Sequence, residues 1–184
     1  MTSSAGSAAS CSSVEPIRPR IGRGVYIAPS AVVCGEVALG DDCTVMHHVL
    51  IRGDVSAVSL GRRCNVQDGT VIHTKTGVPL DIADDVAIGH RAIVHCRRVG
   101  PRTLIGMGAI VLDDAEIGER CVIGAAALVT PGMIVPAGKV LMGVPARIVR
   151  DVTPRDLEYT DFVLKNYLRL NPLHAAGVYP NWNA

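Results

Sequence analysis

Aliphatic residues recur every six positions along most of this 184-residue chain. The register positions are Ile21, Ile27, Val33, Leu39, Val45, Ile51, Leu60, Val66, Ile72, Ile82, Ile88, Val94, Val99, Ile105, Val111, Ile117, Ile123, Val129, Val135 and Leu141. A fixed short period of this kind is typical of an all-β solenoid in which three hexads form one triangular coil. No helical pattern separates the strands before residue 150, which argues against a doubly wound fold. The sequence therefore predicts a β-helix of six to seven coils.

Glycine often follows the register aliphatic residue. This occurs at Gly22, Gly40, Gly61, Gly89, Gly100, Gly106, Gly118 and Gly124. We expect corners at these points, where the chain turns sharply or adopts a positive φ angle.

The register breaks in three places. Ile51–Leu60 spans nine residues instead of six, Ile72–Ile82 spans ten, and Val94–Val99 spans five. Insertions in a solenoid emerge as loops on one face, and such loops often form the binding site. Function is therefore expected near the breaks, where histidines also cluster.

Counting residues across the breaks places two histidines in one column. Ile72 and Val94 are 22 residues apart, which is one coil of 18 plus four inserted residues. They are therefore expected to stack on neighbouring coils. Their successors, His73 and His95, then share a column at about the 4.8 Å spacing of paired strands, so they can hold one metal ion. By the same count Arg52 lies one coil from His73.

His90 is expected at a corner outside that column, because it follows Ile88 by two positions. It can join His73 and His95 only from another protomer. Closed rotational symmetry brings different faces of neighbouring subunits together, and a triangular prism suggests a homotrimer. Three histidines that leave one coordination position open are typical of a catalytic zinc site.

The segments around these residues resemble the gamma-class carbonic anhydrase family over about residues 15 to 170. They are Ile51-Arg52-Gly53-Asp54, Asn65-Val66-Gln67-Asp68-Gly69, Ile72-His73, Ile88-Gly89-His90, Val94-His95 and Ile105-Gly106-Met107-Gly108-Ala109-Ile110. The resemblance implies a left-handed parallel β-helix, a homotrimer and one Zn²⁺ per subunit interface. His73 and His95 of one chain and His90 of its neighbour would bind the metal, with Fe²⁺ and Co²⁺ as alternatives to Zn²⁺.

The activity that the resemblance implies is reversible hydration of carbon dioxide to bicarbonate. Zinc lowers the pKa of bound water from about 15.7 to about 7, so hydroxide would be available at neutral pH to attack carbon dioxide. By the same resemblance, Gln67 and Asn65 hydrogen-bond the zinc-bound solvent or bicarbonate. Tyr167 would approach the site from the C-terminal helix.

The resemblance also assigns a charged cluster to the site. Arg52 would pair with Asp54 and Asp68, either within the chain or across the subunit boundary, and would steer the anion, because an arginine fork suits both carboxylate and bicarbonate. The alternative for this cluster is an interface salt-bridge network without a catalytic part.

Two departures from the family bear on activity. The archaeal prototype has a glutamate where this chain has Val55, and its acidic loop between the first two zinc histidines corresponds here to Thr74–Leu80, which holds no acid. Proton transfer to solvent is therefore unaccounted for, although positioned acid-base groups contribute about 10²- to 10⁴-fold to a rate. Hydratase activity is expected to be weak or absent.

Two other functions stay open at this point. A hexapeptide acyltransferase would use one histidine as general base and bind an acyl thioester carrier along the coils. The crowding of three histidines with Arg52, Asn65, Gln67 and Asp68 exceeds what that mechanism requires. A metal-binding trimer with little or no hydratase activity is the other alternative, and the missing acids favour it.

The chain divides into a disordered tail at 1–14, the β-helix at 15–150, and a C-terminal helix with an irregular tail at 151–184. Thr153-Pro154 is a typical helix start, and residues from Asn171 onward are predicted to be irregular. The net charge of +1 argues against nucleic acid or an acidic membrane as a partner. The first residues lack the features of signal and transit peptides, so we expect a cytoplasmic protein.

The cysteines fit that expectation. Cys43, Cys64 and Cys121 fall four places after a register aliphatic residue and are expected to be reduced core thiols. Cys96 adjoins His95 and is a weaker candidate for a metal ligand. The remaining histidines, His47, His48 and His174, are expected to be solvated or hydrogen-bonded side chains.

Overall fold

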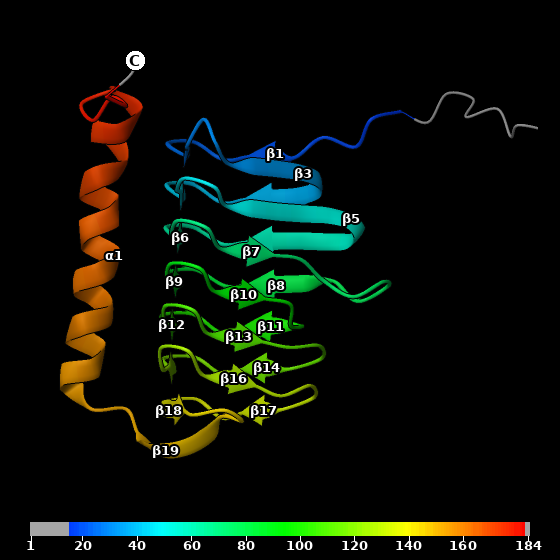
Figure 1. The fold of residues 1–184 in the computed structure, drawn as a ribbon, viewed down its shortest axis with the longest axis vertical. Helices are drawn as coiled ribbons and strands as arrows, with labels where there is room; N and C mark the ends of the chain where they lie inside the picture. Colours follow the sequence, from blue (N-terminus) through cyan, green and yellow to red (C-terminus); the bar gives the residue numbers. More distant parts are fainter. Residues whose placement is uncertain (1–14, 183–184) are drawn as a thin grey trace, which may run out of the picture.

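The computed structural model describes residues 15–182 as a left-handed parallel β-helix of about seven coils, with one long helix beside it (Figure 1). The predicted solenoid and its C-terminal helix are confirmed. The tail predicted at 1–14 lies outside the described residues.

Each coil contributes a short strand to each of three faces. The first face contains β2 (Tyr26–Ile27), β4 (Thr44–Val45), β6 (Asn65–Val66), β9 (Ala87–Ile88), β12 (Leu104–Ile105), β15 (Val122–Ile123) and β18 (Lys139–Met142). The second face contains the first parts of β3 (Val32–Leu39) and β5 (Leu50–Leu60), followed by β7 (Val71–Ile72), β10 (Ile93–Val94), β13 (Ile110–Val111) and β16 (Leu128–Val129). The third face contains β1 (Arg20–Ile21), the second parts of β3 and β5, β8 (Leu80–Ile82), β11 (Arg98–Val99), β14 (Glu116–Ile117) and β17 (Ile134–Val135).

The register aliphatic residues form the core. Ile51, Ile72 and Val94 are fully buried and stack on consecutive coils. On the first coil, which has a neighbouring coil on one side only, Ile21 is 46% exposed and Ile27 and Val33 are partly buried. Cys43, Cys64 and Cys121 are buried in this core as free thiols, as predicted.

Each register glycine directly precedes a turn at a corner, as predicted, but none of them adopts a positive φ angle. Gly89 and Gly106 have ordinary φ angles, and a Cβ at either would lie within 2.7 Å of backbone nitrogen on the next coil. They are therefore needed for the close approach of neighbouring coils. The positive φ angles of the turns fall two residues later in many coils, as at Asp42, Arg63 and Arg91.

The first two breaks of the register have different structures. The residues inserted after Ile51 do not form the expected loop: β5 continues around the corner, paired with β3 through a bulge between Gly35 and Val37. Main-chain pairing on both sides of the bulge lets the strand absorb the extra residues. The residues inserted after Ile72 do form a loop, which projects from the solenoid between β7 and β8 (Figure 1).

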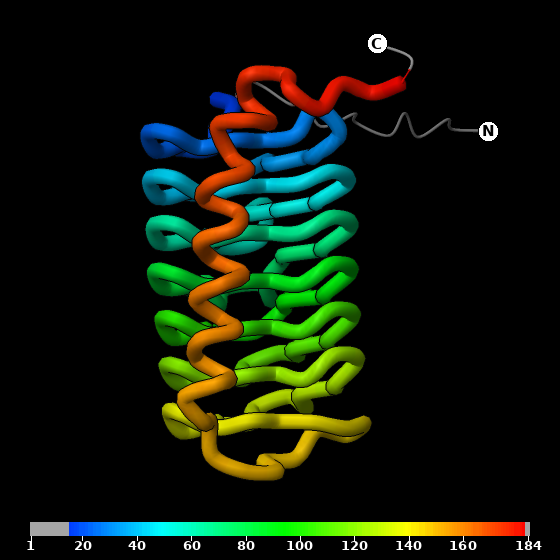
Figure 2. Tube along the Cα trace, turned by 90° about the vertical axis from the view of Figure 1, so that its left-hand side faces the viewer, coloured from blue at the N-terminus to red at the C-terminus, as the bar shows by residue number. Residues whose placement is uncertain are grey.

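Helix α1 (Pro154–Ala175) runs back along the first face, from the last coils to the first (Figure 2). It begins as predicted: Thr153 caps it, Pro154 occupies the first turn, and Asp156 completes a capping box with Thr153. β19 (Arg147–Asp151) precedes it and pairs antiparallel with β18, so it closes the last coil.

The prediction that the chain is irregular from Asn171 onward was wrong for the first residues of that segment. α1 continues to Ala175, and Asn171 is buried with its Nδ2 donating to the carbonyl oxygens of Gly24 (3.0 Å) and Cys43 (3.2 Å). An Asn-Pro pair usually indicates a helix end, but these bonds hold the helix against the first coils. Among the described helices, none has an apolar stretch long enough to cross a membrane.

Candidate metal centre

His73 and His95 meet at the end of the second face, as the residue count predicts. Ile72 pairs with Val94 in register, so the residues that follow them stack on adjacent coils. Nδ1 of His73 lies 3.1 Å from Nε2 of His95, and both side chains are largely buried. The two rings therefore face each other with one nitrogen each, within hydrogen-bond distance.

A carboxylate engages the outer nitrogen of each ring. Nε2 of His73 lies 3.0 Å from Oδ1 of Asp54, and Nδ1 of His95 lies 2.6 Å from Oδ1 of Asp113. Arg52 in turn donates to Oδ2 of Asp54 at 3.0 Å, which is the pairing that the family resemblance implied. Each imidazole is thus fixed by a carboxylate at its outer nitrogen, and its inner nitrogen faces the other ring.

This pair fits a tetrahedral metal ion. Two nitrogens that each lie 2.0–2.1 Å from zinc are separated by about 3.3 Å, close to the separation between His73 and His95. Hydrogen bonding of the outer nitrogen to a carboxylate is the usual second contact of a metal-binding histidine. Within the described residues of one chain, no group of three or more metal-binding side chains is assembled. The described residues of one chain therefore do not by themselves form a site with three protein ligands.

His90 lies at another corner of the prism, in the turn between β9 and β10. Its Nδ1 is 2.9 Å from Oδ2 of Asp68. Within one chain Asp68 therefore pairs with His90, and no bond from Arg52 to Asp68 is present among the described residues. The placement of His90 agrees with the prediction that it cannot join the other two histidines of its own chain.

Two buried amides, Asn65 and Gln67, come just before Asp68, the partner of His90, in the chain. Asn65 lies in β6 on the first face and Gln67 directly follows that strand, and Nε2 of Gln67 donates to Oδ1 of Asn65 at 3.0 Å. This bond orients the Gln67 amide. Nδ2 of Asn65 is buried and has no hydrogen-bond partner among the described residues.

Tyr167 approaches the same corner from α1. Burial raises the pKa of Tyr167 to about 12, and the negative charge of Asp68 adds to the effect. The phenol is therefore protonated at neutral pH and can donate a hydrogen bond, but it cannot act as a base there.

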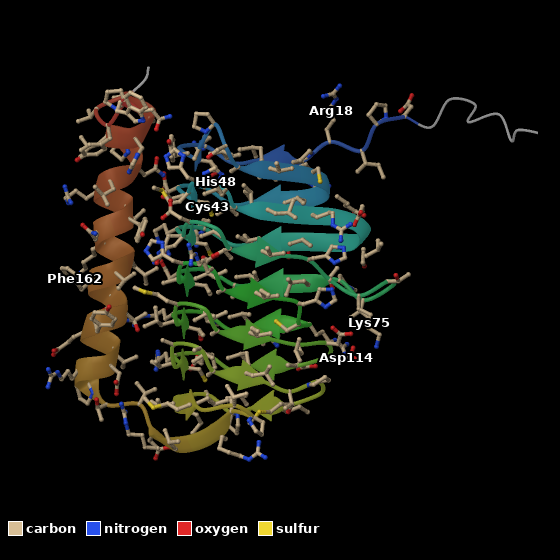
Figure 3. All side chains as sticks on the ribbon, in the orientation of Figure 1. Arg18, Cys43, His48, Lys75, Asp114 and Phe162 are labelled. Carbon is tan, nitrogen blue, oxygen red and sulfur yellow. The ribbon has the colours of Figure 1, made fainter. Side chains whose placement is uncertain are left out.

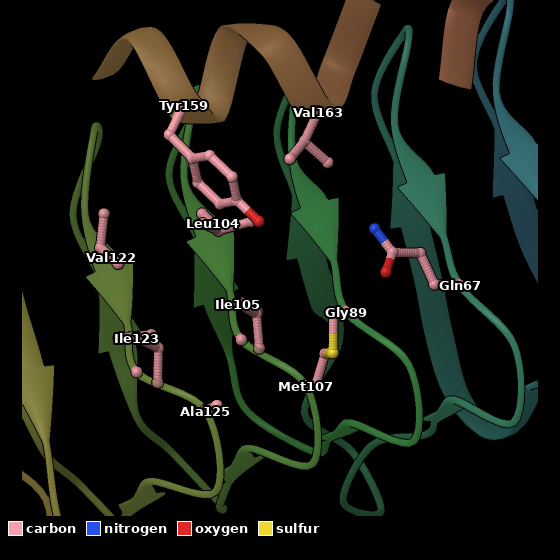
Figure 4. Close-up of a pocket in the computed structure, with 12 residues that line it drawn as sticks. Gln67, Gly89, Leu104, Ile105, Met107, Val122, Ile123, Ala125, Tyr159 and Val163 are labelled. Atoms are coloured by element: carbon pink, nitrogen blue, oxygen red, sulfur yellow. The ribbon is translucent and has the colours of Figure 1, made fainter. Parts of the chain in front are cut away.

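An apolar cavity of about 210 Å³ lies between α1 and the first face (Figure 4). Tyr159 and Val163 of α1 cover it, and Leu104 and Val122 line its floor. Gln67 forms part of its wall, so the cavity adjoins the corner that carries His90.

The predicted site residues thus form two half-sites at opposite edges of the second face. The first half-site contains Arg52, Asp54, His73 and His95, together with Asp113. The second half-site contains Asn65, Gln67, Asp68, His90 and Tyr167. One chain does not bring the two half-sites together.

Cys96 takes no part in either half-site. Its thiol is buried and donates to the carbonyl oxygen of Arg98, and burial raises its pKa to about 12. The side chain points into the core, so its proximity to His95 in the sequence does not make it a ligand of the pair.

Asp113 is the residue that the sequence interpretation missed. The signal available was the acid pair Asp113-Asp114, which follows β13 one coil beyond His95. Asp114 has a different partner, because its Oδ2 accepts a 2.8 Å bond from Lys75 of the inserted loop. Figure 3 shows Lys75 and Asp114 together at the edge of the solenoid.

Comparisons with known proteins agree with this architecture. The family model "Bacterial transferase hexapeptide (six repeats)" matches residues 18–53 and 98–131. A solved Bacillus cereus structure, provisionally named an acetyltransferase, has a TM-score of 0.83 at 36% identity and covers 86% of this chain and 92% of that one. The N-acyltransferase AntD of the same species reaches a TM-score of 0.68 at 18% identity, which shows likeness of fold alone.

Curated relatives carry a more specific name. A Geobacillus kaustophilus carbonic anhydrase is 37% identical and covers 86% of this chain and 87% of its own length. A Methanocaldococcus jannaschii protein named as a probable carbonic anhydrase is 40% identical, over 82% and 95%. Two Arabidopsis thaliana mitochondrial gamma carbonic anhydrases are 34% and 35% identical, and the chain spans 59% and 60% of their lengths. The chain belongs to the gamma-class carbonic anhydrase family.

Proposed function

We propose that this protein is a metal-dependent carbonic anhydrase that hydrates carbon dioxide reversibly to bicarbonate and a proton at the interfaces of a homotrimer. The observation that carries the proposal is the convergence of His73 and His95, each held by a carboxylate, with inner nitrogens 3.1 Å apart. Family membership supports the same activity.

The metal would be bound by His73 and His95 of one protomer and by His90 of its neighbour. Nitrogen donors in a tetrahedral arrangement favour Zn²⁺, and Fe²⁺ and Co²⁺ are compatible with imidazole ligands. Such an ion supplies, when bound, hydroxide at neutral pH as the nucleophile for carbon dioxide. Asp68, which engages Nδ1 of His90, leaves Nε2 as the nitrogen available to the neighbouring chain.

The chemistry of the three faces supports the trimer. On the second face the outward residues form an unbroken apolar column: Val32, Leu50, Val71, Ile93, Ile110 and Leu128. The outward positions of the third face are mostly polar and include Ser59, Asp81, Arg98 and Glu116. The first face is covered by α1. The apolar second face is therefore the one that needs a partner, and its two edges carry the two half-sites.

Threefold association would then join the first half-site of one protomer to the second half-site of the next. In that arrangement Gln67, fixed by Asn65, offers its amide to bicarbonate or solvent. Tyr167 stays protonated and contributes a hydrogen bond. Arg52, held by Asp54, places a positive charge beside the histidines and attracts the anionic product.

Transfer of the product proton from this site to solvent is expected to be slow. Within the inserted loop no side chain is acidic, and Val55 is an exposed apolar residue where the family prototype has glutamate. These two features favour slow turnover, and they also support the second candidate, a metal-binding trimer without hydratase activity. A hexapeptide acyltransferase is not favoured, because a single general base does not require two histidines that face each other.

The test combines metal analysis with a hydration assay. The purified protein is loaded with Zn²⁺, Co²⁺ or Fe²⁺, and carbon dioxide hydration is followed by stopped flow beside His95→Ala. We expect metal-dependent hydration that His95→Ala abolishes. Full metal occupancy without hydration would favour the silent trimer, and the absence of bound metal would contradict the metal centre itself.

A further inference from the structure

Asp113 makes the shorter of the two carboxylate contacts at the histidine pair, at 2.6 Å from Nδ1 of His95. Asp54, by comparison, lies 3.0 Å from His73 and also accepts a bond from Arg52. Since no second cation is bonded to Asp113 in the described structure, its carboxylate is directed to His95 alone.

The backbone holds Asp113 firmly in this position. Val111 pairs with Val94, so the turn after β13 lies one coil beyond His95. The carbonyl oxygen of Asp113 accepts a 2.8 Å bond from the amide of Gly132 on the following coil. The carboxylate is therefore carried by a fixed turn of the solenoid.

The contact with Asp113 favours hydrogen on Nδ1 of His95, because a carboxylate oxygen accepts a hydrogen bond. A metal ion at Nε2 requires that nitrogen to be free of hydrogen, so the neutral ring must carry its hydrogen on Nδ1. Asp113 accepts a hydrogen bond from that position. It therefore favours the tautomer that metal binding needs and fixes the plane of the ring.

We propose that Asp113 is a positioning residue of the metal centre, which holds His95 through Nδ1–H and thereby strengthens metal binding at Nε2. The proposal rests on the metal centre proposed above. Loss of a hydrogen bond to the outer nitrogen of a metal-binding histidine typically lowers metal affinity about 10- to 100-fold.

Asp114 offers a matched control on the same turn. It has the same exposure as Asp113, within a few per cent, but its carboxylate pairs with Lys75. Its φ angle of 59° is one that asparagine tolerates. Asp113→Asn and Asp114→Asn thus remove the same charge at adjacent positions and differ in their contact with His95.

The first experiment measures Zn²⁺ affinity by competition with a chelator, and Co²⁺ absorption spectra report ligand geometry. We expect Asp113→Asn to bind Zn²⁺ about 10- to 100-fold more weakly than wild type and to change the Co²⁺ spectrum, with Asp113→Glu restoring part of the loss. Asp114→Asn should match wild type. Equal affinities for Asp113→Asn and wild type would overturn the proposal.

A second experiment uses the metal-free protein, so that it is independent of the proposed function. Nitrogen-15 NMR at alkaline pH reports the tautomer of His95, and thermal unfolding verifies that the variants are folded. We expect hydrogen on Nδ1 in wild type and in Asp114→Asn, and a shift towards the other tautomer in Asp113→Ala. An unchanged tautomer in folded Asp113→Ala would overturn the positioning role, whereas a wild type that binds no metal would contradict the proposed function.

Discussion

His73 and His95 are separated by 22 residues in the chain, yet Nδ1 of the first lies 3.1 Å from Nε2 of the second. The stacking of Ile72 on Val94 sets this distance, because the residues that follow a pair of stacked core residues also stack. The four residues inserted after Ile72 leave the column intact because they project from it as a loop. The contact between the two histidines therefore follows from the stacking of the coils.

Removal of either imidazole should abolish metal binding. With one nitrogen lost, the remaining donors of the interface cannot complete a tetrahedral site. We expect His73→Ala and His95→Ala to be purified without metal, and His47→Ala, whose ring contacts Ser30, to keep it. Elemental analysis of the purified proteins measures this. Full occupancy in both of the first two variants would contradict the ligand assignment.

The apolar second face should be the contact between protomers. Ile93 lies on that face and is 38% exposed, so Ile93→Glu should bury a charge in the contact and dissociate the assembly. Ile134, on the third face and 74% exposed, is the matched control. Light scattering should give three times the chain mass of 19.4 kDa for wild type and Ile134→Glu, and one chain mass for Ile93→Glu.

Dissociation should also remove the metal, because His90 would no longer reach the histidine pair. Metal retained by monomeric Ile93→Glu would show that one chain suffices, and it would contradict the shared site. A wild type that is monomeric in solution would contradict the trimer directly.

The capping box of α1 should contribute about 1 kcal/mol to the free energy of unfolding. Asp156 accepts bonds from the backbone and hydroxyl of Thr153 and from Arg150, so Asp156→Asn should lower that free energy near neutral pH. The exposed Glu158→Gln should leave it unchanged. Urea unfolding measures both.

The same residue predicts a pH dependence. The hydrogen bond from Arg150, followed by those from Thr153, holds the pKa of Asp156 well below its usual value. A lowered pKa in the folded state gives stability that is present above about pH 4, the usual pKa of the unfolded chain, and is lost as the pH falls further. The difference between wild type and Asp156→Asn should therefore shrink in acid, and a difference that grows would refute this assignment.

The glycines of the register should tolerate no side chain. A Cβ at Gly106 would lie 2.6 Å from the backbone nitrogen of Ala125, so Gly106→Ala should destabilise the coil by about 1–3 kcal/mol. Gly132 has a φ angle of 70° and open space around it, so Gly132→Asn should be tolerated. Thermal unfolding compares the two, and equal stability would contradict the role of close coil spacing.

The sequence predicted the solenoid and the histidine column because both depend on a count along the chain. When core residues such as Ile72 and Val94 stack, the residues that follow them also stack, even where a loop is inserted between the coils. The separation of His90 from this column followed from the same count. The trimer stays a prediction, although the apolar column on the second face now gives it a physical reason.

Features that depend on contacts between distant positions could not be predicted in this way. The continuous strand β5 arises from its pairing with β3 across a bulge. The end of α1 is fixed by bonds from Asn171 to the first coils. Asp113 was missed because a carboxylate in a solenoid turn is normally solvated, and only the position of the His95 ring gives it a partner.

In the proposed trimer, two half-sites on different protomers form one metal-dependent centre for carbon dioxide hydration. The most direct test is the stopped-flow hydration rate of the zinc-loaded protein, measured with its metal content, beside His90→Ala and His95→Ala prepared in the same way. We expect catalysis by wild type above the uncatalysed rate, and none by either variant. A metal-loaded wild type that hydrates carbon dioxide no faster than buffer would contradict the proposed function.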